Sequence, residues 1–251
     1  MPLRVRIPLP TASPDEVAVA RLHAIACRLC DRDSREHHAD RKPFSITPAF
    51  DAGDFLAFDL RLLDDARATE VLTALDDVRQ HGLRLGERLA AVDALWAAHL
   101  EVEAVSWDQV ADVGDVRRIR FDVLTPTGFR RGNRALVDPS PGRIFAHLRG
   151  VWNAFCPPEL RMELDLKGLD LELSQFDLRT EGYEITRRTG RPGNRPARSL
   201  EGFVGWLEVD LSGIGPDQRS CLGALASLAS LSGVGTSTTA GMGVVEGHLL
   251  V

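Results

Sequence analysis

The stretch Gly233-Val-Gly-Thr-Ser-Thr-Thr-Ala-Gly-Met-Gly243 is a glycine-rich loop between two regular elements. Residues 221–231 before it have helical apolar spacing, and residues 244–251 after it have the pattern of a strand. Glycine permits positive φ and lets backbone N–H groups approach a ligand, so such a loop suits a phosphate. Nucleotide-binding loops, however, follow a strand and open a helix, and the Lys-Ser/Thr pair is missing here. Three interpretations remain: a nucleic-acid backbone site, a nucleotide site and a plain turn.

The rest of the second half completes a βαββαβ order around this loop. Proline and glycine in 125–128 are expected to break the first strand. The predicted strands are 118–124, extended residues within 169–185, 202–211 and 244–250, and the predicted helices are 141–155 and 216–231.

The first half repeats that order. Residues 3–9 alternate apolar and polar side chains, and Ser13-Pro-Asp-Glu16 is typical of a helix start, with the helix continuing to about Cys30. Extended segments at 43–50 and 55–63, a helix at 67–80, and strand-like residues from Arg84 and at 100–105 follow. The sequence predicts an α+β chain of two tandem ferredoxin-like (RRM-like) βαββαβ domains, 1–114 and 115–251.

Composition restricts the function classes. The chain has 251 residues, 44% of them apolar, and a net charge of −6, so a nucleic-acid partner requires a local basic patch. We expect no membrane span, because eighteen consecutive apolar residues never occur, and no signal peptide, because residues 1–6 lack its apolar core. Cys27-x-x-Cys30 lies in a helical pattern with no second pair, so we expect no metal and no cofactor, and a reduced cytoplasm as the setting.

Two clusters supply positive charge in the second half. Within 187–198 there are five arginines and no acid, among glycine, proline and asparagine that are typical of a loop or hairpin tip. A second cluster lies within 129–134. We predict that these residues contact RNA phosphates, and a solvated tip without a partner is the alternative. The arginines are Arg187, Arg188, Arg191, Arg195 and Arg198, and Arg130, Arg131 and Arg134.

The loop predicted after the first helix carries His37, His38 and Lys42. Histidine can move protons at neutral pH, and a nearby cation can stabilise charge that develops on a phosphate. This combination suits metal-free RNA cleavage, in which the 2′-hydroxyl attacks its own phosphate, and a plain polar loop is the alternative. His23 and Arg21, on the first helix, are interpreted as a partly buried and a solvated helix residue.

Taken together, these motifs resemble the CRISPR-associated repeat-processing endoribonucleases, the sixth numbered Cas family of the RAMP superfamily. The resemblance spans nearly the whole chain, although Thr236 stands where many members have a basic residue after the second glycine. The residues that carry it are Gly202–Leu211, Leu231–Val245, Phe121–Phe129, Pro139–Phe155, and His37/His38 with Lys42-Pro-Phe-Ser45.

The resemblance implies cleavage of CRISPR precursor RNA within each repeat, which releases mature guide RNAs without a metal. It implies that His37 or His38 is the general acid or base, with Lys42 beside it, and that RNA contacts come from the arginines and from Gly233, Gly235, Gly241 and Gly243. It implies CRISPR repeat RNA, and other effector-complex subunits, as partners. A non-catalytic RNA-binding subunit of a CRISPR complex is the second interpretation, and a small-molecule nucleotide-binding enzyme is the third.

Overall fold

The computed structural model describes residues 1–11, 17–31, 41–132, 134–184 and 199–251. Its residues group into two compact units. The first contains Met1–Ala104 and Thr239–Gly241, and the second contains Val105–Tyr183, Leu200–Thr238 and Met242–Val251. The second compact unit begins at Val105. The domain boundary at residue 114 stays a prediction.

The first unit is built on an antiparallel sheet. Its central strand β1 (Leu3–Leu9) buries its alternate apolar side chains completely, while Arg4 and Arg6 lie on the opposite face and stay partly exposed. β1 pairs with β4 (Leu56–Leu62) and β7 (Glu101–Ala104), and β4 pairs with β2 (Phe44–Ile46) and β3 (Phe50–Asp51). The strand order is β2-β4-β1-β7.

Two helices cover the apolar face of this sheet. α1 (Val19–Cys30) buries Leu22 and Ile25, and α3 (Asp65–His81) buries Val71 and Leu75 in the same core. α3 begins where the Asp64 side chain accepts the Ala66 N–H, and it ends at a glycine with positive φ. The predicted helix 67–80 is confirmed within its ends. The predicted start at 13–16 lies outside the described residues, and the described α1 begins at Val19.

Three short elements of the first unit differ from the prediction. Residues from Arg84 form a small hairpin, β5 (Leu83–Leu85) with β6 (Arg88–Ala90), that is separate from the main sheet. The helix α4 (Asp93–His99) follows it and was not predicted. Its Trp96 is buried and donates its indole N–H to the Pro8 carbonyl at 3.0 Å. This contact with β1 stabilises a helix that is too short to show a clear apolar periodicity in the sequence.

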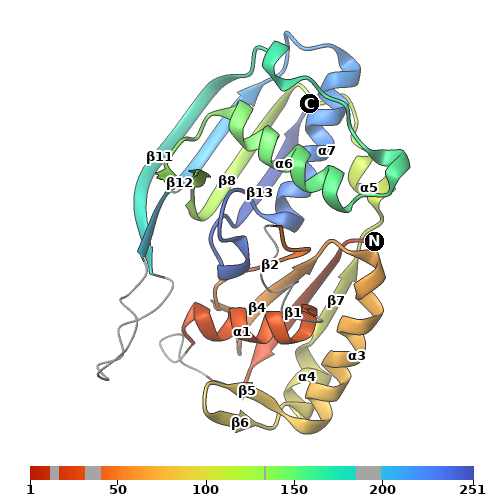
Figure 1. The fold of residues 1–251 in the computed structure, drawn as a ribbon, viewed down its shortest axis with the longest axis vertical. Helices are drawn as coiled ribbons and strands as arrows, with labels where there is room; N and C mark the ends of the chain where they lie inside the picture. Colours follow the sequence, from red (N-terminus) through yellow and green to blue (C-terminus); the bar gives the residue numbers. More distant parts are fainter. Residues whose placement is uncertain (12–16, 32–40, 133, 185–198) are drawn as a thin grey trace. The chain divides into compact units, whose positions relative to one another are not determined.

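The second unit has the same plan. Its sheet runs β11-β12-β8-β13, and α6 and α7 cover one face of it (Figure 1). Trp152 of α6 is fully buried and meets Trp107 edge-on with ring centroids 5.2 Å apart. The elements are α5 (Trp107–Ala111), β8 (Arg118–Thr127), α6 (Pro141–Phe155), η2 (Pro158–Leu160), η3 (Leu166–Gly168), β11 (Glu172–Glu184), β12 (Ser199–Asp210), α7 (Pro216–Ser232), η4 (Thr238–Ala240) and β13 (Val245–Leu250).

The first strand ends within the predicted break at 125–128 but later than expected, because β8 continues through Pro126 to Thr127. Proline cannot donate a ladder hydrogen bond, and here the β8–β12 pairing shifts register. Three residues of β8, 124–126, stand opposite the single residue Val204 of β12. A hairpin that was not predicted, β9 (Phe129–Arg131) with β10 (Arg134–Leu136), follows directly.

Both sheets place the first strand between the third and the fourth, with the second strand at an edge. With two helices packed on the sheet, this is the ferredoxin-like arrangement of a βαββαβ unit. The predicted fold class, α+β with two tandem ferredoxin-like domains, is confirmed.

Candidate functional site

The predicted catalytic histidines, His37 and His38, lie outside the described residues, as do the arginines predicted within 187–198. The structure describes both ends of the histidine segment. Asp31 precedes it as the C-cap of α1, and Arg41 and Lys42 follow it before β2.

Lys42 is engaged in an ion pair with Asp31. Its ammonium Nζ lies 2.7 Å from Oδ1 of Asp31, and the two side chains are only 11% and 8% exposed. The same ammonium lies 5.8 Å from the ring centroid of Phe44, which is buried at the start of β2. Removing one partner of a buried ion pair typically costs about 3–5 kcal/mol, so this pair strongly favours the observed position of Lys42.

The end of α1 is held from a second side. Arg67 of α3 donates from Nη1 to the carbonyl oxygen of Cys30, and its Nε donates to Asp64 at 3.1 Å. The last turn of α1 is therefore fixed by charged partners from two other segments of the first unit.

The thiol of Cys27 lies in the same turn. Burial, followed by the charge of Asp31, raises the pKa of the Cys27 thiol to about 12, so the thiol is neutral at working pH.

His23 of α1 has partners that the sequence did not reveal. Its Nδ1 lies 2.7 Å from the carbonyl oxygen of Thr239, a contact to a carbonyl that requires a proton on Nδ1. Its Nε2 lies 3.5 Å from Sγ of Cys27, one turn further along the helix. Spacing of i and i+4 hints at the cysteine contact, but residue 239 is too distant in sequence for any local pattern to find it.

The four predicted glycines are buried and adopt positive φ, from 66° at Gly243 to 88° at Gly235. A Cβ on Gly243 would overlap the Val234 carbonyl oxygen, and one on Gly235 would overlap the Gly128 carbonyl oxygen. Gly235 and Gly243 thus allow close backbone packing inside the second unit.

Several N–H groups of this loop have partners within the chain. The amide of Val234 donates to Gly243, that of Thr236 donates to Gly128, and that of Gly243 donates to Pro126, at 2.8–3.1 Å. These amides are satisfied internally, so a ligand contact from this loop would need its other N–H groups.

The hairpin β9–β10 carries Arg130, Arg131 and Arg134, and all three side chains are exposed. Arg134 stands directly opposite Arg131, and within the described part of the chain none of the three has an acidic partner. Like charges across a strand pair are unfavourable, and an anion between them relieves that repulsion. The hairpin therefore presents three exposed cations that can neutralise a phosphate.

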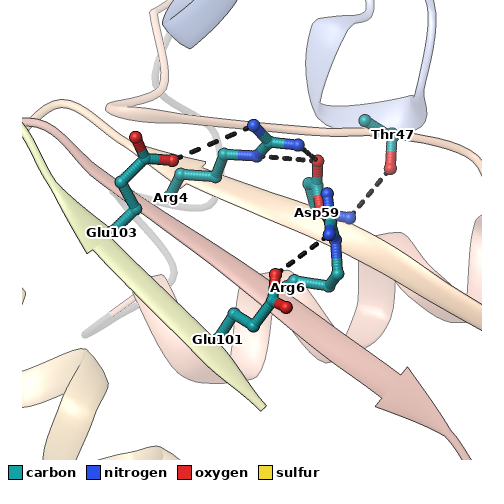
Figure 2. A network of polar contacts seen from close by, with 6 residues as sticks. All are labelled: Arg4, Arg6, Thr47, Asp59, Glu101 and Glu103. Carbon is teal, nitrogen blue, oxygen red and sulfur yellow. Dashed lines mark hydrogen bonds and ion pairs between the residues drawn. The ribbon is translucent and has the colours of Figure 1, made fainter. Parts of the chain in front are cut away.

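A polar network that was not predicted covers the other face of the first sheet (Figure 2). Asp59 is buried and accepts from Arg4 at 2.7 and 2.9 Å and from Arg6 at 3.3 Å. Each arginine also reaches a glutamate of β7, Glu103 for Arg4 and Glu101 for Arg6. Since three carboxylates face two guanidinium groups, these cations are already neutralised, and the network ties β1, β4 and β7 together.

Among the described residues, no three His, Cys, Asp or Glu side chains gather closely enough to hold a metal ion. No helix in the same ranges is both long enough and apolar enough to cross a membrane.

Comparison with known proteins adds to this geometry. The family model of CRISPR-associated endoribonuclease Cas6 matches residues 121–245. No curated protein sequence matches the chain significantly.

Solved structures match over the whole chain. The product complex of Thermus thermophilus Cas6 (TTHB231) is 27% identical, covers 99% of both chains and has a TM-score of 0.78. The product complex of Cas6 (TTHA0078) is 19% identical, covers 99% of this chain and 100% of that one, and has a TM-score of 0.74. A chain of the partial Cas6-RT-Cas1–Cas2 complex is 16% identical, and this chain covers 46% of it with a TM-score of 0.54.

Proposed function

The chain belongs to the CRISPR-associated endoribonuclease Cas6 family, and from this premise we propose that it cleaves CRISPR precursor RNA within the repeat and releases mature guide RNAs. The observation that carries the proposal is the match to the product complex of Cas6 (TTHB231), which extends over 99% of both chains at 27% identity. The proposed substrate is the repeat RNA, and the proposed product is the guide RNA.

The proposed chemistry needs no metal. The 2′-oxygen of the nucleotide before the cleavage point attacks the adjacent phosphorus, and the bond from phosphorus to the 5′-oxygen breaks. A base removes the 2′-hydroxyl proton and an acid delivers a proton to the leaving 5′-oxygen. The products are a 2′,3′-cyclic phosphate and a 5′-hydroxyl.

His37 or His38 is the proposed proton-transfer residue, because an imidazole changes charge near neutral pH and both lie in one segment after α1. Lys42 is the third proposed residue of this site, and its ammonium forms an ion pair with Asp31.

The proposed RNA-binding surface consists of the two basic clusters and the glycine-rich loop. Its described part is the β9–β10 hairpin, whose three exposed guanidinium groups lack acidic partners among the described residues. Other CRISPR proteins are proposed partners as well, and a neighbour of the same fold lies in a Cas6-RT-Cas1–Cas2 complex. A cytoplasmic setting stays a prediction.

The test is incubation of the protein with a labelled repeat RNA in the presence of a chelator. A single cut inside the repeat, with a cyclic phosphate on the upstream product, is expected. Binding without cleavage would instead favour the non-catalytic RNA-binding subunit, and neither binding nor cleavage would contradict both interpretations.

A further inference from the structure

We propose that Arg131 and Arg134, which face each other across the β9–β10 hairpin, form a clamp that binds a single RNA phosphate together. This inference rests on the RNA binding in the proposed function and deepens it, because it assigns two of the cations to one shared phosphate.

The register of the hairpin places the two side chains on one face. Arg131 stands directly opposite Arg134, and Arg130 stands opposite Ala135. Directly opposite residues of an antiparallel pair share a face, with Cβ atoms about 4.5–5.5 Å apart, and successive side chains of a strand alternate between faces. Arg131 and Arg134 can therefore reach the same anion, whereas Arg130 lies on the other face of the hairpin.

The two arginines of the clamp have exposed side chains, and neither forms an ion pair with an acidic residue in the described part of the chain. The nearest acid along the sequence, Asp138, is already paired with Arg143, with Oδ2 2.7 Å from Nε. Like charges directly opposite each other repel, and a phosphate between them replaces that repulsion by two attractions.

The chemistry of arginine suits this arrangement. The guanidinium group is planar and presents a rigid fork of N–H donors, which matches the oxygens of a phosphate. A phosphate has enough acceptor oxygens to receive donors from two guanidinium groups at once. Two arginines on one face of a hairpin can therefore hold one phosphate from two sides.

The base of the hairpin is attached to the core of the second unit. Phe129, the first residue of β9, is buried, and its ring centroid lies 6.5 Å from that of Phe203. The carbonyl oxygen of Gly128 accepts the N–H of Thr236 at 2.8 Å. A fixed base reduces the conformational freedom that is lost on binding, so the clamp is partly preorganised for its phosphate.

The experiment measures the salt dependence of repeat-RNA binding by the full chain, for Arg131→Ala, Arg134→Ala and the double variant. The log–log slope counts the neutralised phosphates, at roughly 0.7–0.9 for each. With one shared phosphate, either single variant still neutralises it, so the affinity should fall while the slope keeps its parental value. The double variant should lower the slope once, by roughly 0.7–0.9.

Separate phosphate contacts give a different pattern, in which each single variant lowers the slope by roughly 0.7–0.9. A lower slope in either single variant therefore overturns the inference, and so does a parental slope in the double variant. Cleavage by the parent protein tests the proposed function independently. A parent that binds repeat RNA without cutting it contradicts the proposed cleavage, and the slopes still decide whether the clamp exists.

Two further variants guard against a general effect of charge or fold. Arg79 is exposed and paired with Asp93 at 2.7 Å, so Arg79→Ala removes a surface cation and should keep the parental slope and affinity. Arg131→Glu puts a carboxylate opposite Arg134, where the two side chains can pair with each other. It should lower the slope as the double alanine variant does, and a slope equal to that of Arg131→Ala overturns the inference. Thermal unfolding shows that each variant is folded.

Discussion

At the scale of single residues, the most direct prediction concerns the two histidines. A positioned proton-transfer group contributes about 10²–10⁴-fold to rate, so His37→Ala or His38→Ala should lower single-turnover cleavage by that factor. Binding should stay constant, since a neutral imidazole is not a main phosphate anchor.

Cleavage rates and dissociation constants are measured for both single variants and for the double variant. The matched control is His81→Ala on α3, since His81 is exposed and pairs with Asp77 in its own helix. Parental cleavage by the double variant would contradict the assignment, and His23 would then be the next histidine to replace.

The glycines lead to a prediction about folding. Gly243 has φ of 66° and packs against the Val234 carbonyl, so Gly243→Val combines a left-handed backbone with a steric overlap. A left-handed conformation alone costs roughly 1–2 kcal/mol for an L-residue, and the overlap adds to it. The free energy of unfolding in urea should fall by at least that amount.

Gly213 is the control for this prediction, because it lacks positive φ and has open space at its Cβ position. Gly213→Ala should be close to neutral. Equal stability of Gly243→Val and the parent would show that the loop does not need a glycine there.

The backbone geometry predicted for this loop is observed, and its contact with RNA stays a prediction. The glycine pattern predicted positive φ and close approach, and both are observed. It assigned the close approach to a ligand, whereas the observed partners are backbone carbonyls of residues 128 and 234. The Asp31–Lys42 and His23–Thr239 contacts could not be predicted, because only the folded chain brings those residues together.

At the scale of elements, the β9–β10 hairpin makes the sharpest prediction. Replacement of Arg130, Arg131 and Arg134 by alanine should weaken RNA binding and lower the log–log salt slope by roughly 0.7–0.9 for each phosphate that the protein no longer neutralises. The matched control is Arg79→Ala on α3, an exposed arginine already paired with Asp93.

The dissociation constant is measured at several salt concentrations. An unchanged slope in the triple variant would show that this hairpin does not touch RNA. The same measurement on the arginines at 187, 188, 191, 195 and 198 tests the second basic cluster independently.

The long helices were predictable, and several short elements were not. The predicted helix 141–155 has the observed bounds, 216–231 ends one residue early, and 67–80 lies inside the observed helix. They were predictable because apolar spacing persists over several turns. The hairpins β5–β6 and β9–β10 and the helix α4 are too short for such a period. Pro126 misled the prediction, because it lies among the residues of β8 that a register shift leaves without a partner in β12.

At the scale of the whole molecule, two sheets of unrelated sequence share one strand order. The order of elements along the chain was predicted because each element leaves a local pattern. Pairing within each sheet is a long-range property, and it followed from the ferredoxin-like plan and not from any residue pattern. The network around Asp59 is likewise a long-range property, because it joins three strands that are far apart in sequence.

The final prediction concerns the metal dependence of cleavage. In the proposed reaction, histidine transfers protons and cations of the chain neutralise phosphate, so no step requires a divalent ion. The single-turnover rate in excess EDTA should equal the rate in magnesium. Because magnesium also screens phosphates and stabilises RNA structure, both reactions need matched ionic strength and an RNA whose folding is checked in each buffer. Loss of cleavage in EDTA at unchanged RNA binding, with recovery on adding a divalent ion, would mean that a metal takes part in the chemistry.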